Sequence, residues 1–170
     1  MQIALQLDPQ DPSIHYHLGL LYQLLQTPSH ALIEYQLACH LRPYDCHLRV
    51  ALGEAYYDQQ NVDKAIECYV LAESLGDEEG VCSRRLGDLY AKKGEELKSA
   101  YFYKRYLKKR KMKVCDADTY HCALALCKYY RKEGKKDELI QMCNLLLTSS
   151  DEGAQREARS MLACTLYRVC

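Results

Sequence analysis

Apolar residues recur along this chain at intervals of three and four, which places their side chains on one face of an α-helix. One such series runs through Ile14, Leu18, Leu21 and Leu25, and similar series return at several later points. Signals for helix starts separate the series, as at Thr27, an N-cap residue that is followed by proline. The pattern predicts short helices joined by tight turns, and therefore an all-α fold.

The predicted helices recur in pairs at a constant interval along the chain. The clearest copy has a leucine–glycine pair and four spaced small or aromatic residues, at Leu52, Gly53, Tyr56, Ala65, Tyr69 and Ala72. The corresponding positions one interval earlier hold Leu18, Gly19, Tyr22, Ala31, Tyr35 and Ala38, and those one interval later hold Leu86, Gly87, Tyr90, Ser99, Tyr103 and Tyr106. Such a fixed period is typical of stacked helical hairpins. We therefore expect core positions for the recurring tyrosines Tyr22, Tyr56, Tyr69, Tyr90 and Tyr103.

This period predicts a single domain over residues 1–170, a right-handed α-α superhelix of helix-turn-helix repeats. Its expected parts are the end of a truncated repeat (1–11), three repeats (12–45, 46–79 and 80–113), a degenerate repeat (120–152) and a C-terminal capping helix (153–170). Gly134 fixes the register of the degenerate repeat, because it falls at the same turn position as Gly94.

Charge is unevenly distributed along the chain. Residues 1–80 hold 3 Lys/Arg against 12 Asp/Glu, a net of −9, whereas residues 81–170 hold 20 against 11, a net of +9. This polarity favours electrostatic docking or end-to-end assembly, and two solvated faces that differ in charge would account for it equally well. No stretch approaches the roughly 20 uncharged apolar residues that span a bilayer, so no membrane association is expected.

Ten cysteines raise the question of disulfides or a metal, yet no two of them are spaced C-x-x-C. Most lie where a helix would bury a small apolar residue, so we expect structural thiols. The dipeptides Cys39-His40 and Cys46-His47 would have to converge on one ion, but adjacent helical side chains point about 100° apart. No glycine-rich phosphate loop or nucleophile constellation is present either, so we expect no metal, no cofactor and no catalysis.

The spaced residues of this period resemble the tetratricopeptide repeat, and the resemblance covers nearly the whole chain. The stretches 40–45, 51–56 and 65–78 also look like the C-terminal repeats of subunit eight of the anaphase-promoting complex (cyclosome), the cell division cycle protein 23 family. That resemblance implies a non-catalytic scaffold of a nuclear and cytoplasmic ubiquitin ligase that contacts coactivator and neighbouring subunits during cell division. The chain lacks the N-terminal repeats through which that family pairs, so homodimerisation is not implied.

The first helix of each pair should line a concave groove and present its off-stripe residues to a partner. By register these candidates are Tyr16, Gln23, His47, Glu54, Tyr57, Arg84, Asp88, Lys92, Lys128 and Arg131, with Leu20 and Val50 between them. Aromatic and charged groups on a rigid concavity suit capture of a peptide segment from another protein. The alternative is a solvated inner face that binds nothing.

A second candidate surface is the basic run after the third repeat. Its residues are Lys104, Arg105, Lys108, Lys109, Arg110 and Lys111. Such a run suits docking to an acidic partner or, less well, a nucleic acid, and the plainer alternative, which we favour, is a solvated helix end whose dipole favours lysine. Two other functions stay open beside the ubiquitin-ligase scaffold. One is a generic co-chaperone or adaptor of the same repeat class, and the other, which is less favoured, is an RNA-binding helical repeat protein.

Overall fold

The computed structural model describes residues 10–112, 116–149 and 151–167, and within them it contains nine α-helices and no strand. The expected all-α helical-repeat fold is therefore confirmed. The expected fragment of a truncated repeat lies almost wholly outside the described residues. The chain divides into two compact units, Met1–Asp77 and Glu78–Cys170.

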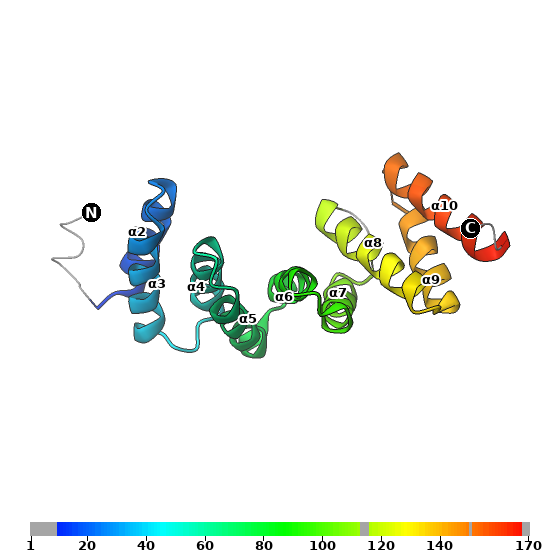
Figure 1. Ribbon diagram of the computed structural model, residues 1–170. Helices are drawn as coiled ribbons and strands as arrows, with labels where there is room; N and C mark the ends of the chain where they lie inside the picture. The colour runs from blue at the N-terminus through cyan, green and yellow to red at the C-terminus, as the bar shows by residue number, and fades with distance from the viewer. Residues whose placement is uncertain (1–9, 113–115, 150, 168–170) are drawn as a thin grey trace. The chain divides into compact units, whose positions relative to one another are not determined.

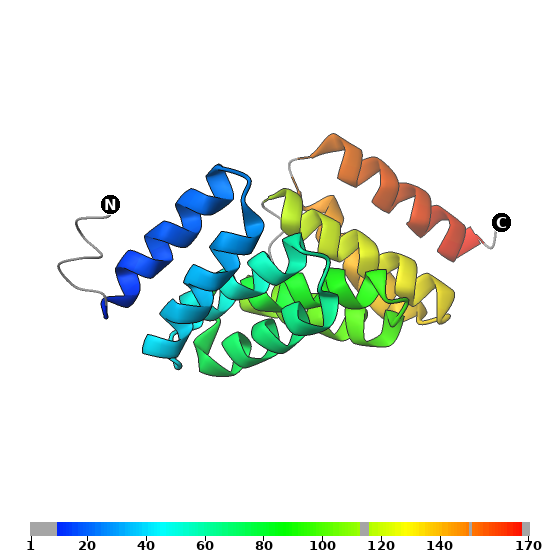
Figure 2. The same cartoon turned by 60° about the vertical axis from the view of Figure 1, so that its left-hand side comes forward.

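The first unit consists of two helical hairpins. Its helices are α2 (Pro12–Leu24), α3 (Pro28–Leu41), α4 (Cys46–Asp58) and α5 (Val62–Gly76). Helix α2 packs on α3, α3 packs on α4, and α4 packs on α5 (Figures 1 and 2). Each hairpin thus matches one predicted repeat, and we call its first helix the A helix and its second the B helix.

The second unit has two further hairpins and a closing helix. Its helices are α6 (Val81–Lys92), α7 (Glu96–Lys109), α8 (Ala117–Lys132), α9 (Lys136–Leu147) and α10 (Glu152–Tyr167). Packing again follows chain order, from α6 on α7 to α7 on α8 and α8 on α9, and α10 covers α9 (Figure 1). No helix in the described part of the chain is long and apolar enough to cross a membrane.

A glycine on each A helix and a tyrosine on the following B helix form the centre of the first three hairpins. A Cβ atom built on the glycine would lie 2.5 Å from the ring for Gly19 and Tyr35, 3.0 Å for Gly53 and Tyr69, and 2.5 Å for Gly87 and Tyr103. The three rings are buried, with at most 3% of their surface exposed. The recurrence of this glycine and of the B-helix tyrosine is therefore explained by one contact, in which a flat ring lies against bare backbone.

The recurring tyrosines of the A helices are placed differently from our expectation. Tyr22, Tyr56 and Tyr90 are half-buried rather than core residues. Their rings border the core and are met by polar groups: Gln36 Nε2 donates to the Tyr56 hydroxyl at 2.8 Å, and Lys98 Nζ lies 5.0 Å from the Tyr90 ring centroid. The B-helix tyrosines already fill the space beside each glycine, so the A-helix rings remain at the rim.

The predicted apolar stripe of α2 is only partly correct. Leu21 and Leu25 are exposed. The buried positions of α2 are instead Pro12, His15 and Gly19. His15 Nδ1 lies 2.7 Å from Glu34 Oε2 of α3, so this polar pair joins the two helices where the sequence suggested only apolar residues.

Local capping explains where the helices begin. Asn61 caps α5 by accepting from the backbone N–H of Lys64, whereas the side chain of the expected cap Thr27 donates to the Tyr22 carbonyl and does not cap α3. Helix α8 begins at Ala117, before the expected start of the degenerate repeat at residue 120. Asp116 accepts there from the backbone N–H of Thr119, and the Thr119 hydroxyl accepts in return from the Asp116 N–H, a capping box.

Candidate functional site

In the first unit the predicted groove residues lie on α2 and α4, and the buried Tyr35 of α3 contacts one of them, Gln23. His47 is exposed, while Tyr16, Gln23, Glu54 and Tyr57 are half-buried. The Tyr35 hydroxyl of α3 donates to Gln23 Oε1 at 2.6 Å, and Gln23 Nε2 donates to Asp58 Oδ2 of α4 at 3.4 Å. Burial raises the pKa of Tyr35, so its hydroxyl keeps the proton that it donates. The Gln23 side chain thus links its own helix α2 to α3 and α4.

Aromatic groups dominate the rest of this surface. The ring of Tyr16 lies 6.0 Å from that of Tyr35 and 5.5 Å from that of His17, measured between centroids. Tyr16 therefore belongs partly to the packing and partly to the surface. Together with Tyr57, Glu54 and the unpredicted Asp58, it gives the first unit an aromatic and acidic A-helix side.

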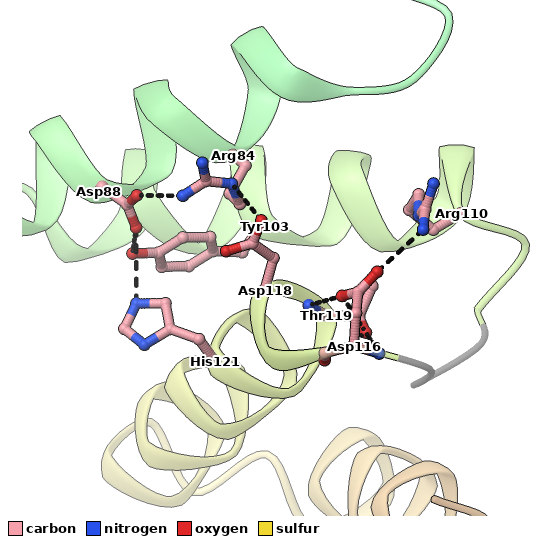
Figure 3. A network of polar contacts seen from close by, with 8 residues as sticks. All are labelled: Arg84, Asp88, Tyr103, Arg110, Asp116, Asp118, Thr119 and His121. Carbon is pink, nitrogen blue, oxygen red and sulfur yellow. Dashed lines mark hydrogen bonds and ion pairs between the residues drawn. The ribbon is translucent and has the colours of Figure 1, made fainter.

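In the second unit two predicted residues, Arg84 and Asp88, are joined by an ion pair (Figure 3). Arg84 Nη1 lies 3.1 Å from Asp88 Oδ2, and Arg84 Nε lies 3.3 Å from Asp118 Oδ2 of α8. Asp88 Oδ1 accepts from the Tyr103 hydroxyl of α7 at 2.8 Å and lies 3.5 Å from His121 Nε2 of α8. This network connects α6, α7 and α8, which are consecutive helices of the unit.

The network leaves little of its central pair accessible. The Arg84 side chain is 17% exposed and that of Asp88 27%, whereas Asp118 and His121 are 56% and 61% exposed. Burial and the Asp88 carboxylate both raise the pKa of Tyr103, so its hydroxyl stays a donor. A partner would therefore meet Asp118 and His121 before Arg84 and Asp88. Neither Asp118 nor His121 was predicted, because six extra residues interrupt the repeat period just before α8.

The second half of α8 carries the other predicted residues of this unit. Lys128 and Arg131 are exposed, and no ion pair within the described residues involves either of them. Lys92 at the end of α6 is also exposed. The neighbouring Lys132 is instead paired with Glu96, at 2.6 Å between Nζ and Oε2. The end of α6 and the second half of α8 are therefore cationic, whereas the A-helix side of the first unit is acidic.

The predicted basic run occupies the end of α7 and the turn that follows. Lys104, Arg105, Lys108 and Lys111 are exposed, and Lys109 and Arg110 are half-buried. Arg110 is partly structural, because its Nη2 lies 2.9 Å from Oδ2 of Asp116, the N-cap of α8. The hydrogen bond from the backbone N–H of Thr119 lowers the pKa of Asp116, and Arg110 adds to this effect.

A pocket of about 430 Å³ lies between α3 and α4. It is lined by Gln36, Cys39, His40, Pro43, Arg49 and Leu52. Burial raises the pKa of Cys39 to about 11, so the thiol is not an activated nucleophile. Across the part of the chain that the structure covers, no three His, Cys, Asp or Glu side chains gather as a metal site would require.

Comparisons with known proteins agree with the helical-repeat architecture. Mouse (Mus musculus) tetratricopeptide repeat protein 21A is 31% identical over an alignment of 134 positions that covers 76% of this chain. The transcriptional activator NprA of Geobacillus stearothermophilus is 28% identical over an alignment of 175 positions that covers 94% of this chain. The chain spans only 10% and 43% of the lengths of these two relatives. No protein-family model matches the chain.

Solved structures give the same fold. YrrB, described as a tetratricopeptide-repeat protein with an unusual peptide-binding site, superimposes with a TM-score of 0.76 at 15% identity, over 98% of this chain and 82% of YrrB. MamA superimposes with a TM-score of 0.71 at 18% identity, over 95% and 86%. PilF of Pseudomonas aeruginosa gives 0.72 at 17% identity, over 98% and 81%. The chain has the fold of tetratricopeptide-repeat proteins.

Proposed function

We propose that this protein is a non-catalytic interaction scaffold that binds peptide segments of partner proteins on its A helices. The observation that carries the proposal is the support that buried tyrosines give to polar side chains of the A helices. Tyr35 holds Gln23 at 2.6 Å and Tyr103 holds Asp88 at 2.8 Å, in hairpins that have the same Gly–Tyr contact. Fixing such side chains before binding lowers the conformational entropy that a partner has to overcome.

The two units offer different chemistry to a partner. Glu54, Asp58 and the rings of Tyr16 and Tyr57 suit a segment with basic and apolar residues on the first unit. On the second unit, the exposed cations Lys92, Lys128 and Arg131 suit an acidic segment or a terminal carboxylate. Each unit is expected to bind on its own face, and the partner's charge decides which one it uses.

The narrower hypothesis from the sequence is a scaffold role in the anaphase-promoting complex, with coactivator and neighbouring subunits as partners and a nuclear and cytoplasmic location. The relatives reported above give it no support, and a generic tetratricopeptide-repeat adaptor agrees with them equally well. We retain the complex as a testable hypothesis within the broader scaffold proposal.

Affinity capture with matched variants tests the proposal. The tagged chain is used to recover partners from native cells for mass spectrometry, in parallel with Lys128→Glu and Lys136→Glu. Both lysines are exposed residues of the fourth hairpin, but only Lys128 belongs to the predicted set. We expect Lys128→Glu to lose an acidic partner that the wild type and Lys136→Glu both recover, with the same melting temperature for all three.

The outcomes separate the hypotheses. Equal recovery by all three chains would contradict binding on α8. Recovery of cullin-like and coactivator subunits would support the ubiquitin-ligase role, and recovery of other proteins would support a generic adaptor. Lys104→Glu on the basic run, also exposed, distinguishes docking on α7 from docking on α8. Salt-dependent binding of single-stranded RNA by the purified chain would favour the nucleic-acid alternative instead.

A further inference from the structure

The fourth hairpin replaces the central glycine–tyrosine contact with two cysteines. One constant offset relates Leu86, Gly87 and Tyr103 to Leu126, Cys127 and Cys143, and the same offset relates Gly94 to Gly134. Cys127 therefore occupies the glycine position of the A helix α8, and Cys143 occupies the tyrosine position of the B helix α9. The one contact that organises each earlier hairpin has become a contact between two thiols.

The geometry of this pair is close and enclosed. The Sγ atoms of Cys127 and Cys143 lie 3.9 Å apart, and both residues are 0% exposed. Their neighbours in the core include the fully buried Leu126 and Leu146. The two sulfur atoms thus stand at the positions that glycine and tyrosine hold in the earlier hairpins, and they face each other across the α8–α9 interface at about van der Waals distance.

We propose that Cys127 and Cys143 form a redox modification site, at which a low-molecular-weight disulfide converts the two thiols into an intrachain disulfide between α8 and α9. The thiolate of one cysteine attacks the S–S bond of the small disulfide, which breaks, releasing one small thiol and leaving a mixed disulfide. The second cysteine thiolate then attacks the protein sulfur of that mixed disulfide and releases the second small thiol. The two electrons pass to the small disulfide, and the two protons end on the released thiols.

Burial of the two thiols determines when they can react. The adjacent Cys143 thiol and burial raise the pKa of Cys127, so in the closed hairpin the thiol is protonated and shielded from oxidant. Reaction therefore proceeds through molecules in which α9 has moved away from α8, and closure then shields the new bond from reduction. The bond would join α8 to α9 at Cys127, the residue directly before Lys128. This inference stands on the thiol geometry and does not depend on the proposed peptide binding.

Oxidative refolding of the full chain tests the site without requiring the oxidant to enter a closed core. The chain is unfolded, then refolded to equilibrium in buffers of defined reduced-to-oxidised glutathione ratio, quenched with an alkylating reagent and digested with trypsin. We expect loss of the mass of two hydrogen atoms, and a linked pair of peptides covering residues 114–128 and 137–156. Because the first peptide also contains Cys115 and Cys122, the variants Cys127→Ala, Cys143→Ala and Cys122→Ala are refolded in parallel.

The expected pattern is loss of the link in Cys127→Ala and Cys143→Ala and its retention in Cys122→Ala, which removes another fully buried thiol. The oxidised wild type should melt roughly 5–10 °C above the reduced one, because the bond closes a short loop in the unfolded chain. Alkylation of both thiols at every glutathione ratio would overturn the proposal. So would a link that survives Cys127→Ala, or an oxidised form that melts below the reduced one.

Discussion

Gly87→Ala tests whether the ring-on-glycine contact determines the stability of a hairpin. A Cβ atom at position 87 would lie 2.5 Å from the Tyr103 ring, whereas non-bonded carbon atoms prefer about 3.5–4.0 Å. The ring cannot move aside freely, because it is buried and its hydroxyl donates to Asp88. The added methyl group must therefore displace the ring or separate α6 from α7.

The magnitude follows from three opposing effects. Overpacking a core costs about 1–3 kcal/mol, and weakening a hydrogen bond to a charged group costs up to about 1.5–3 kcal/mol. Alanine gains about 1 kcal/mol over glycine in helix propensity. We expect a net loss of about 1–3 kcal/mol in the free energy of unfolding, measured by urea denaturation followed by helical circular dichroism.

Two matched variants identify the cause. Gly53→Ala should cost less, because its Cβ atom would lie 3.0 Å from the Tyr69 ring. Gly134→Ala meets no atom within 4 Å but has φ +68°, so it isolates backbone strain of about 1 kcal/mol. Gly87→Ala should lower the free energy of unfolding less in a chain that already carries Tyr103→Leu than it does in the wild type. Stability of Gly87→Ala equal to or above that of the wild type would refute the reasoning.

Three further results are expected. Tyr103→Phe should lower the free energy of unfolding by about 1.5–3 kcal/mol in chemical denaturation, because the half-buried Asp88 carboxylate loses a donor. The pKa of Asp116 is lower in the folded chain than its value of about 3.9 in the unfolded chain, so the ionised carboxylate adds stability. This stability is complete above the unfolded pKa and is lost as the pH falls through the folded pKa. Asp116→Asn should therefore flatten the decline in melting temperature between about pH 6 and pH 3. Glu157→Gln should lower the pKa of Tyr120, now about 12, in an ultraviolet titration, because the carboxylate raises it.

The fold was predictable because one contact is repeated at a constant spacing. The same separation along the chain joins Gly19 to Tyr35, Gly53 to Tyr69 and Gly87 to Tyr103, and each pair requires the same close crossing of two helices. The period does not distinguish the buried tyrosine of a B helix from the half-buried tyrosine of an A helix, because both recur once in every repeat. Only the three-dimensional crossing shows that Tyr69, rather than Tyr56, lies against Gly53.

The surface was less predictable, because it depends on pairs that the period does not relate. Arg84 and Asp88 were expected to face a partner, yet each bonds to a side chain of another helix, through Asp118 and Tyr103. The six residues inserted before α8 shift its register, so no extrapolation from the earlier repeats could place Asp118 or His121 beside α6.

The fourth hairpin also differs from the others in how its surface is supported. In the earlier hairpins the contact between glycine and tyrosine leaves a hydroxyl that reaches across the A helix, as Tyr35 and Tyr103 show. Cysteine at both positions removes that hydroxyl, so no buried tyrosine of α9 supports the side chains of α8. Lys128 and Arg131 are correspondingly exposed, without an ion pair in the described structure. Polar groups supported from the core therefore belong to the earlier A helices, and adaptable cations belong to α8, where a partner of variable acidic sequence is more easily accommodated.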